Sequence, residues 1–163
     1  MEYTIRTMNM QDREAVIDIF NYYVENSFAA YPEMKLPYQA FEMFLKMSEN
    51  LPAVSIISPE DKVVGFGMLK KFNPLPNFSH TVEIAYFIDR DHTGKGLGKM
   101  VLDHLETEGA KTGVTNILAS ISSLNQGSIN FHAKNGFIHT GVFRNAGKKK
   151  GHLFDIVWMQ KVI

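Results

Sequence analysis

Three alternating glycines behind a run of strand-forming residues give this sequence its clearest chemical potential. The segment Asp91–Gly98 reads Asp-His-Thr-Gly-Lys-Gly-Leu-Gly and leads into a helical pattern that begins at Leu97. Glycine allows backbone dihedral angles that other residues avoid, and it leaves no side chain in the way of a ligand. The first turn of a helix also presents free N–H groups and a partial positive charge. These features predict a phosphate-binding turn, to which Lys95 and Lys99 add positive charge.

The spacing of Gly94, Gly96 and Gly98 fits neither common nucleotide-binding motif. A Walker A loop needs Gly, four residues and then Gly-Lys-Ser/Thr, a pattern that the sequence lacks. A dinucleotide fingerprint needs its third glycine one residue later, and it follows the first strand of its fold, whereas this turn follows the fourth expected strand. The remaining alternative to a phosphate site is a tight strand-to-helix turn that binds nothing.

Glu83 and His132 are the side chains best suited to acid–base catalysis. Glu83 lies within the apolar run Val82–Ala85, where desolvation would raise its pKa toward the range that suits a general base. Strand alternation places it on the same face as Phe87. The competing interpretation of Glu83 is an exposed glutamate on the outer face of a strand, and that of His132 is a packed histidine on a short helix. No histidine shows the His-Glu-x-x-His spacing of a zinc site, so we assign no metal.

Hydrophobic periodicity predicts seven strands and four helices in the order β-α-α-β-β-β-α-β-α-β-β. The expected strands are residues 3–5, 54–57, 63–72, 81–88, 117–121, 137–143 and 153–162. The expected helices follow Asn9 and Pro37, begin at Leu97, and begin at Asn125. Hairpins combined with a crossover helix predict a mixed sheet in an α/β protein. The three lysines within Gly147–Gly151 are expected in a solvated hairpin turn.

Composition narrows the class of protein. The chain has 163 residues, with 17 Lys and Arg against 17 Asp and Glu, and it has no cysteine. We expect one domain over residues 1–163. Balanced charge argues against a nucleic-acid-binding module, and no stretch approaches the ~20 apolar residues that cross a bilayer. Without cysteine there is no disulfide and no covalent thiol mechanism. We expect a cytoplasmic protein with no membrane or nucleic-acid partner.

Three motifs resemble a known enzyme family. Gly94–Gly98, following Tyr86-Phe87-Ile88, resembles the pyrophosphate loop of the GNAT superfamily of N-acetyltransferases. Residues 125–137, Asn-Gln-Gly-Ser-Ile-Asn-Phe-His-Ala-Lys-Asn-Gly-Phe, are similar to the Asn-x-x-Ser … His-x-x-x-Gly-Phe helix of its phosphinothricin acetyltransferase-like branch, and Thr81-Val82-Glu83 matches that branch's Thr-Val-Glu. The resemblance covers nearly the whole chain and implies the GNAT fold, a mixed central sheet of about seven strands flanked by about four helices.

The resemblance implies transfer of an acetyl group from acetyl-CoA to the primary amine of a small molecule, such as an amino acid or analogue, by direct attack in a ternary complex. The residues implied to bind acetyl-CoA are the loop Gly94, Lys95, Gly96, Leu97, Gly98 and Lys99, the backbone of Tyr86, Phe87 and Ile88, and Asn125. Asn125 is equally well explained as a plain helix N-cap. Glu83 is the implied base, through a bound water, and His132 is implied to protonate or position the sulfur.

The acceptor side departs from the family. Residues 75–80, Leu-Pro-Asn-Phe-Ser-His, lack the Arg that the branch usually carries there, which speaks against phosphinothricin itself as the acceptor. Thr93 stands where the family commonly has Arg or Gln. The candidate acceptor-site residues are Phe28, Phe78 and His80, with Tyr31 and Phe72 as further loop aromatics. Two alternative functions stay open: acetylation of a protein N-terminus or lysine, and a non-catalytic acyl-CoA-binding sensor. Relatives of this branch often pair, so a homodimer is also an expectation.

Overall fold

The computed structural model describes residues 2–163, and its centre is a seven-stranded sheet in the order β1-β2-β3-β4-β5-β7-β6. The strands are β1 Thr4–Thr7, β2 Ala53–Ile57, β3 Val63–Lys71, β4 Thr81–Ile88, β5 Asn116–Ser122, β6 Ile138–Lys149 and β7 His152–Val162. Neighbouring strands pair antiparallel, except that β4 and β5 run parallel. The prediction of a mixed sheet in an α/β fold is therefore confirmed.

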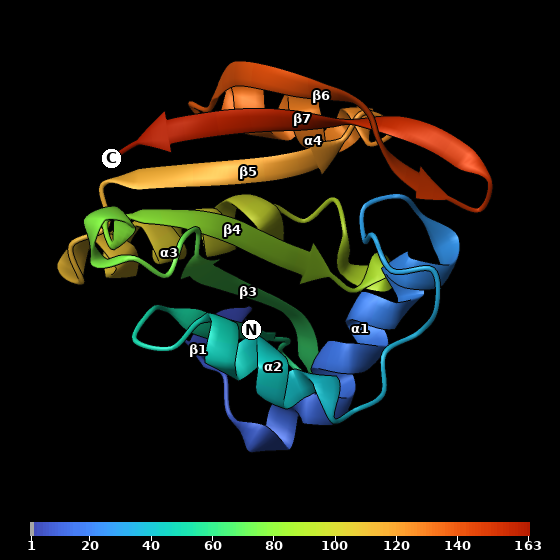
Figure 1. Ribbon diagram of the computed structural model, residues 1–163. Coiled ribbons are helices and arrows are strands. Elements are labelled where there is room, and N and C mark those ends of the chain that lie inside the picture. The colour runs from blue at the N-terminus through green and yellow to red at the C-terminus, as the bar shows by residue number, and fades with distance from the viewer. Residues whose placement is uncertain (1) are drawn as a thin grey trace.

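Two pairs of helices cover opposite faces of this sheet (Figure 1). The α-helices are α1 Arg13–Asn26, α2 Ala40–Met47, α3 Leu97–Lys111 and α4 Gln126–Lys134, and short 3-10 helices span Met10–Asp12, Pro76–Phe78 and Arg90–His92. Helices α1 and α2 share one apolar cluster with Phe66 and Met68 of β3. Helix α3 packs in a second cluster with β3, β4 and β5, and side chains of α4 join it. No helix within residues 2–163 has the length and apolarity that a bilayer crossing requires.

The alternation of β4 decides which side chains meet which helices. Val82 and Ile84 lie in the cluster beneath α3, whereas Ala85 and Phe87 pack against the cluster of α1 and α2. Since side chains alternate along a strand, Glu83 shares the face of Phe87, as the sequence predicted, and the structure shows that this face is the one covered by α1 and α2. The same alternation puts Tyr86 on the α3/α4 face.

The two parallel strands separate soon after they begin to pair. Residues Thr81–Glu83 of β4 pair with Asn116–Leu118 of β5, and no later residue of either strand pairs with the other within residues 2–163. Beyond that point the strands diverge (Figure 1). The edge of Ile84–Ile88 that faces β5 therefore carries backbone N–H and C=O groups without a strand partner.

The C-terminal hairpin corrects one prediction. Strand β6 continues to Lys149, and the turn is confined to Lys150 and Gly151, both with positive φ. Lys148 and Lys150 are exposed, but Lys149 is completely buried. Its Nζ donates hydrogen bonds to the backbone carbonyls of Ser27 and Ala30, at 2.7 and 2.6 Å. The expectation of a solvated turn is thus wrong for Lys149, because the longer hairpin reaches the loop that follows α1.

Candidate active site

The glycine-rich turn connects the end of β4 to helix α3. Asp89 caps the N-terminus of the intervening 3-10 helix, because its side chain accepts a hydrogen bond from the Asp91 N–H at 2.9 Å. Gly94 and Gly96 follow with φ of 73° and 78°, in the left-handed region that favours glycine. Gly96 is the N-cap of α3, and it offers no side chain to the helix amides. The sequence therefore folds into a turn whose helix end is left uncapped.

This uncapped end presents free hydrogen-bond donors. The backbone N–H groups of Leu97, Gly98 and Lys99 donate no hydrogen bond within residues 2–163, and the first turn of α3 carries no acidic residue. The Lys99 ammonium is paired with Asp103 at 2.7 Å, so it is not free to face a ligand in this geometry. Lys95 is exposed, with its Nζ 5.9 Å from the centroid of the Tyr3 ring. The free amides and the helix dipole make this turn attractive to an anion.

Glu83 faces a charged neighbour on the α1/α2 side of the sheet. Glu83 of β4 pairs with Lys70 of the neighbouring strand β3, and its Oε1 is 3.9 Å from Lys70 Nζ. The two side chains are 23% and 27% exposed. The expectation of an apolar setting for Glu83 is therefore wrong: its strand neighbours are apolar, but its cross-strand partner is an ammonium group. A carboxylate in this position can accept a proton and remains accessible from the surface.

Tyr31 and Ser120 lie on the same side as Glu83. The Tyr31 hydroxyl is 3.1 Å from Ser120 Oγ, and Ser120 stands on β5 just beyond the last pair with β4. Burial raises the pKa of Tyr31, and the negative charge of Glu83 raises it further, against a lowering by Ser120. Sequence reasoning named Tyr31 as a loop aromatic but missed Ser120, because a serine alternating with apolar strand residues carries no motif.

His132 is buried on the opposite face and is held at both ring nitrogens. Its Nδ1 is 2.7 Å from the carbonyl oxygen of Ser128, and its Nε2 is 2.7 Å from the Tyr86 hydroxyl. A carbonyl can only accept, so Nδ1 carries the proton and Nε2 accepts from Tyr86. Burial lowers the pKa of His132, against a raising effect of the Ser128 bond. Burial raises the pKa of Tyr86, and the charge of Glu106 adds to this.

This pairing changes the interpretation of both side chains. A neutral imidazole with both nitrogens engaged is arranged to orient a neighbour rather than to release a proton. The sequence pointed only to the backbone of Tyr86, whereas the structure shows that its hydroxyl also has a buried partner. The two residues are 46 positions apart, and no local pattern in the sequence connects them.

The other expected site residues are placed separately. Asn125 caps α4, and its Oδ1 accepts a hydrogen bond from Ser128 N–H at 3.3 Å. Phe28 packs against Phe154 of the C-terminal hairpin, with ring centroids 5.9 Å apart. Phe78 packs against Phe72 in the segment before β4, and His80 is exposed beside it. The predicted acceptor residues thus belong to two different regions.

Residues 2–163 contain no cluster of three or more His, Asp or Glu side chains suited to a metal ion.

Comparison with known proteins adds to this geometry. The family model described as Acetyltransferase (GNAT) family matches residues 16–137. An L-amino acid N-acyltransferase of Escherichia coli is 28% identical over 158 residues, which cover 96% of this chain and 92% of that protein.

Two solved structures share the fold over nearly the full chain. A ribosomal-protein-alanine N-acetyltransferase from Brucella melitensis superposes with a TM-score of 0.91 at 28% identity, covering 98% of this chain and 99% of that one. A phosphinothricin acetyltransferase from Sinorhizobium meliloti, solved in complex with acetyl-CoA, gives a TM-score of 0.93 at 25% identity, covering 100% of this chain and 89% of that one.

The pairing of Tyr86 with His132 predicts a coupled effect on stability. Tyr86→Phe and His132→Leu should each lower the free energy of unfolding by about 1–3 kcal/mol, because each leaves a buried polar group unpaired. The double variant should lose less than the sum, with a coupling of roughly 0.5–3 kcal/mol. Urea unfolding of the four proteins measures this cycle. Strictly additive losses would show that the two side chains do not interact.

Burial of neutral His132 also predicts a pH dependence of stability. Its pKa is lower in the folded state than in the unfolded state, so the unfolded chain binds the proton first as pH falls. Wild-type stability should therefore decrease as pH drops below about 6.5, and His132→Leu should lose that part of the slope. Urea unfolding between pH 7.5 and pH 5 compares the two. If the free energy of unfolding depends on pH equally in the wild type and in His132→Leu, the assignment of His132 as a buried neutral group would be contradicted.

Proposed function

The chain belongs to the acetyltransferase (GNAT) family and is an N-acetyltransferase; on this premise we propose that it transfers the acetyl group of acetyl-CoA to the primary amine of a small molecule, an amino acid or an amino-acid analogue. The observation that carries the proposal is the uncapped turn Gly94–Lys99 beside the separated strands β4 and β5. The name of the Escherichia coli relative supports an L-amino acid as acceptor. The acetyl-CoA complex of the Sinorhizobium relative supports the donor. We propose residues 1–163 as one such domain.

The residues of the turn fit a diphosphate. The N–H groups of Leu97, Gly98 and Lys99 are free, and Gly94–Gly96 are exposed, so an anion can approach the helix end. The unpaired edge of β4 offers the backbone of Tyr86, Phe87 and Ile88 to a strand-like pantetheine arm, although the Ile88 carbonyl already accepts a hydrogen bond from the Tyr23 hydroxyl. Asn125 is proposed to add a contact from the start of α4. When bound, acetyl-CoA supplies the acetyl group as a reactive thioester.

Glu83 is the proposed base. An ammonium group cannot attack a thioester, so the acceptor must lose a proton first. Glu83 is accessible on the α1/α2 face, close to the point where β4 and β5 separate, and Lys70 holds its carboxylate from the neighbouring strand. We propose that the carboxylate takes the amine proton through a bound water. The Tyr31 hydroxyl and Ser120 lie on the same face as Glu83, and the charge of Glu83 acts on Tyr31, so we propose that both residues border the path of the acceptor.

His132 and Tyr86 act from the other face. Because Ser128 and Tyr86 occupy both imidazole nitrogens, we propose that His132 positions the Tyr86 hydroxyl rather than protonating the leaving sulfur. The sequence left open whether His132 protonates or positions the sulfur; the role proposed here differs from both, because His132 would act through Tyr86. Glu83 and the Tyr86–His132 pair lie on opposite faces of the sheet. Glu83 can therefore act on the amine from one face while Tyr86 acts on the thioester from the other.

Acetylation of a protein N-terminus is the second candidate function. It is favoured by one observation, the similarity to the Brucella melitensis ribosomal-protein-alanine N-acetyltransferase. A thiol-release assay with acetyl-CoA separates the candidates if its panel contains free L-amino acids, their analogues, and peptides with a free N-terminal alanine. Turnover with peptides alone would favour the second candidate. Tight CoA binding without thiol release from any amine would contradict both.

Glu83→Gln should lower kcat by about 10²–10⁴-fold with the best amine of that panel, because the amide cannot accept the proton. The dissociation constant for CoA should stay within about twofold, since Glu83 faces away from the α3/α4 side of the sheet. Steady-state kinetics and calorimetry measure the two quantities. Glu60→Gln, an exposed glutamate in a turn, is the matched control. An unchanged rate at neutral pH would remove Glu83 from the mechanism.

Gly96→Val should weaken CoA binding about tenfold or more. A left-handed conformation disfavours an L side chain by roughly 1–2 kcal/mol. If the backbone at position 96 changes to relieve this strain, the N–H groups at the start of α3 move with it. Gly113→Val is the matched control. Gly113 also has a positive φ, 92°, but it lies beyond the other end of α3, so a similar strain there should leave CoA affinity intact. Calorimetric titration measures the dissociation constant of each variant for CoA. Normal affinity in Gly96→Val would mean that the diphosphate binds elsewhere.

A further inference from the structure

We propose that Lys149 is a positioning residue for the acceptor amine: it holds the segment Ser27–Glu33 against the tip of the β6–β7 hairpin, and so keeps Tyr31 in place on the Glu83 side of the sheet. The assignment rests on the proposed function, because it concerns how the acceptor reaches Glu83. It gives a role to a lysine that local sequence places in a solvated turn.

The ammonium group of Lys149 is unusual in its surroundings. It is fully buried, and among residues 2–163 it has no carboxylate within ion-pair distance. Its hydrogen bonds go to the carbonyl oxygens of Ser27 and Ala30, at 2.7 and 2.6 Å. Burial lowers the pKa of Lys149, and the charge of Lys150 adds to this, while Glu33 opposes it. A buried charge is costly unless it is hydrogen-bonded, so the two carbonyls must stay where the ammonium needs them.

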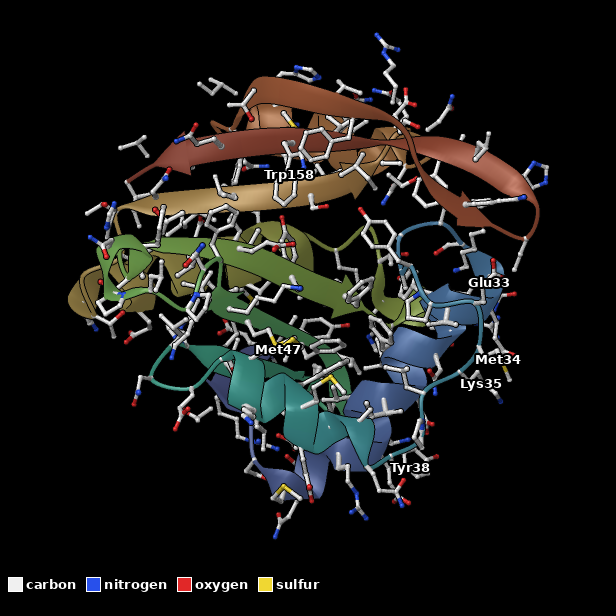
Figure 2. All side chains as sticks on the ribbon, in the orientation of Figure 1. Glu33, Met34, Lys35, Tyr38, Met47 and Trp158 are labelled. Carbon is white, nitrogen blue, oxygen red and sulfur yellow. The ribbon has the colours of Figure 1, made fainter. Side chains whose placement is uncertain are left out.

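Further contacts join the same two segments. The Lys150 N–H donates to Glu33 Oε1 at 2.9 Å, and Lys150 Nζ donates to the carbonyl oxygen of Glu25 at the end of α1. The Tyr31 ring stacks on Phe154 of β7 with centroids 5.8 Å apart and planes 22° from parallel. Figure 1 shows the loop after α1 beneath the hairpin tip, and Figure 2 labels Glu33 at this junction. Loop and hairpin therefore form one packed unit, of which Lys149 is the buried link.

This unit reaches the candidate acceptor side through Tyr31. Its hydroxyl is 3.1 Å from Ser120 Oγ, at the point where β5 has left β4. Ser120 pairs with Trp158 of β7, whose neighbours Val157 and Met159 face the α3/α4 cluster. Trp158, labelled in Figure 2, therefore faces the α1/α2 side. Its strand partner Ser120 faces the same side. Glu83 is on that side too. The placement of Tyr31 thus shapes the space from which an amine reaches Glu83.

A neutral residue at position 149 would leave the carbonyls of Ser27 and Ala30 without their donor. The segment would relax away from the hairpin, and Tyr31 would move with it. The turn Gly94–Lys99 belongs to other elements, β4 and α3, and would not be affected. A positioning role therefore predicts a change in acceptor binding that leaves acetyl-CoA binding alone, whereas general damage to the fold would change both.

The test uses Lys149→Met, which keeps the length of the side chain and removes its charge. The acceptor is the best amine identified for the wild type. We expect the KM of Lys149→Met for this amine to rise about tenfold or more, because a displaced Tyr31 would no longer position the acceptor. The KM of the variant for acetyl-CoA should stay within about twofold of the wild-type value. Lys149→Arg, which keeps donors for the carbonyls, should recover part of the loss. Lys148→Met, the exposed neighbour on the same hairpin, should behave as wild type.

Two results would overturn the assignment while the proposed function stands: an unchanged acceptor KM in Lys149→Met, or an equal rise of both KM values. A wild type that releases no thiol with any amine would overturn the proposed function, and the assignment with it. If Lys149→Met does not fold, Tyr31→Phe replaces it. That variant removes only the hydroxyl that meets Ser120, and it should raise the acceptor KM alone; an unchanged value would overturn the assignment.

Discussion

The parallel pairing of β4 with β5 stops after three residue pairs, and the arrangement of the candidate site depends on that early stop. A continuous ladder would consume the backbone groups of Ile84–Ile88 and close the sheet between its two faces. Because the strands separate, one edge of β4 is left free, and a single 3-10 helix connects β4 to the uncapped turn at Gly94–Lys99. Glu83 lies where the pairing ends, on one face, and the Tyr86–His132 pair lies on the other. A ligand between the strands would meet both.

Burial and hydrogen bonding distinguish two charged groups that join segments of this protein from the proposed base. Asp12 is 2% exposed and accepts hydrogen bonds from Arg6, Ser55 and the Asn9 N–H, and together these outweigh the effect of burial and lower its pKa. Lys149 is equally enclosed and is held by two carbonyls. Glu83 differs from both, because it is partly exposed and its charged partner, Lys70, is 3.9 Å away. A carboxylate held this loosely suits the role of base proposed for Glu83, whereas the others hold segments of the chain together.

Local patterns predicted most of the fold, because each depends on neighbouring residues. Strand alternation placed Glu83 on its face, and the glycine spacing located the turn before α3. The contacts that complete the site are of a different kind. His132 meets Tyr86 across 46 residues, and Tyr31 meets Ser120 across 89, so only the folded sheet brings them together. Lys149 shows the limit most clearly: three lysines between glycines are typical of a solvated turn, but the loop that buries Lys149 is 119 residues away in the sequence.

The central claim, that backbone amides at the start of α3 bind the diphosphate of coenzyme A, can be tested amide by amide. Proton–nitrogen correlation spectra of the labelled protein, recorded during titration with coenzyme A, report on each N–H group separately. The account predicts the largest changes at Leu97, Gly98 and Lys99, with downfield proton shifts as their hydrogen bonds to phosphate form. Saturation with coenzyme A that leaves these three signals in place, while amides elsewhere move, would contradict it.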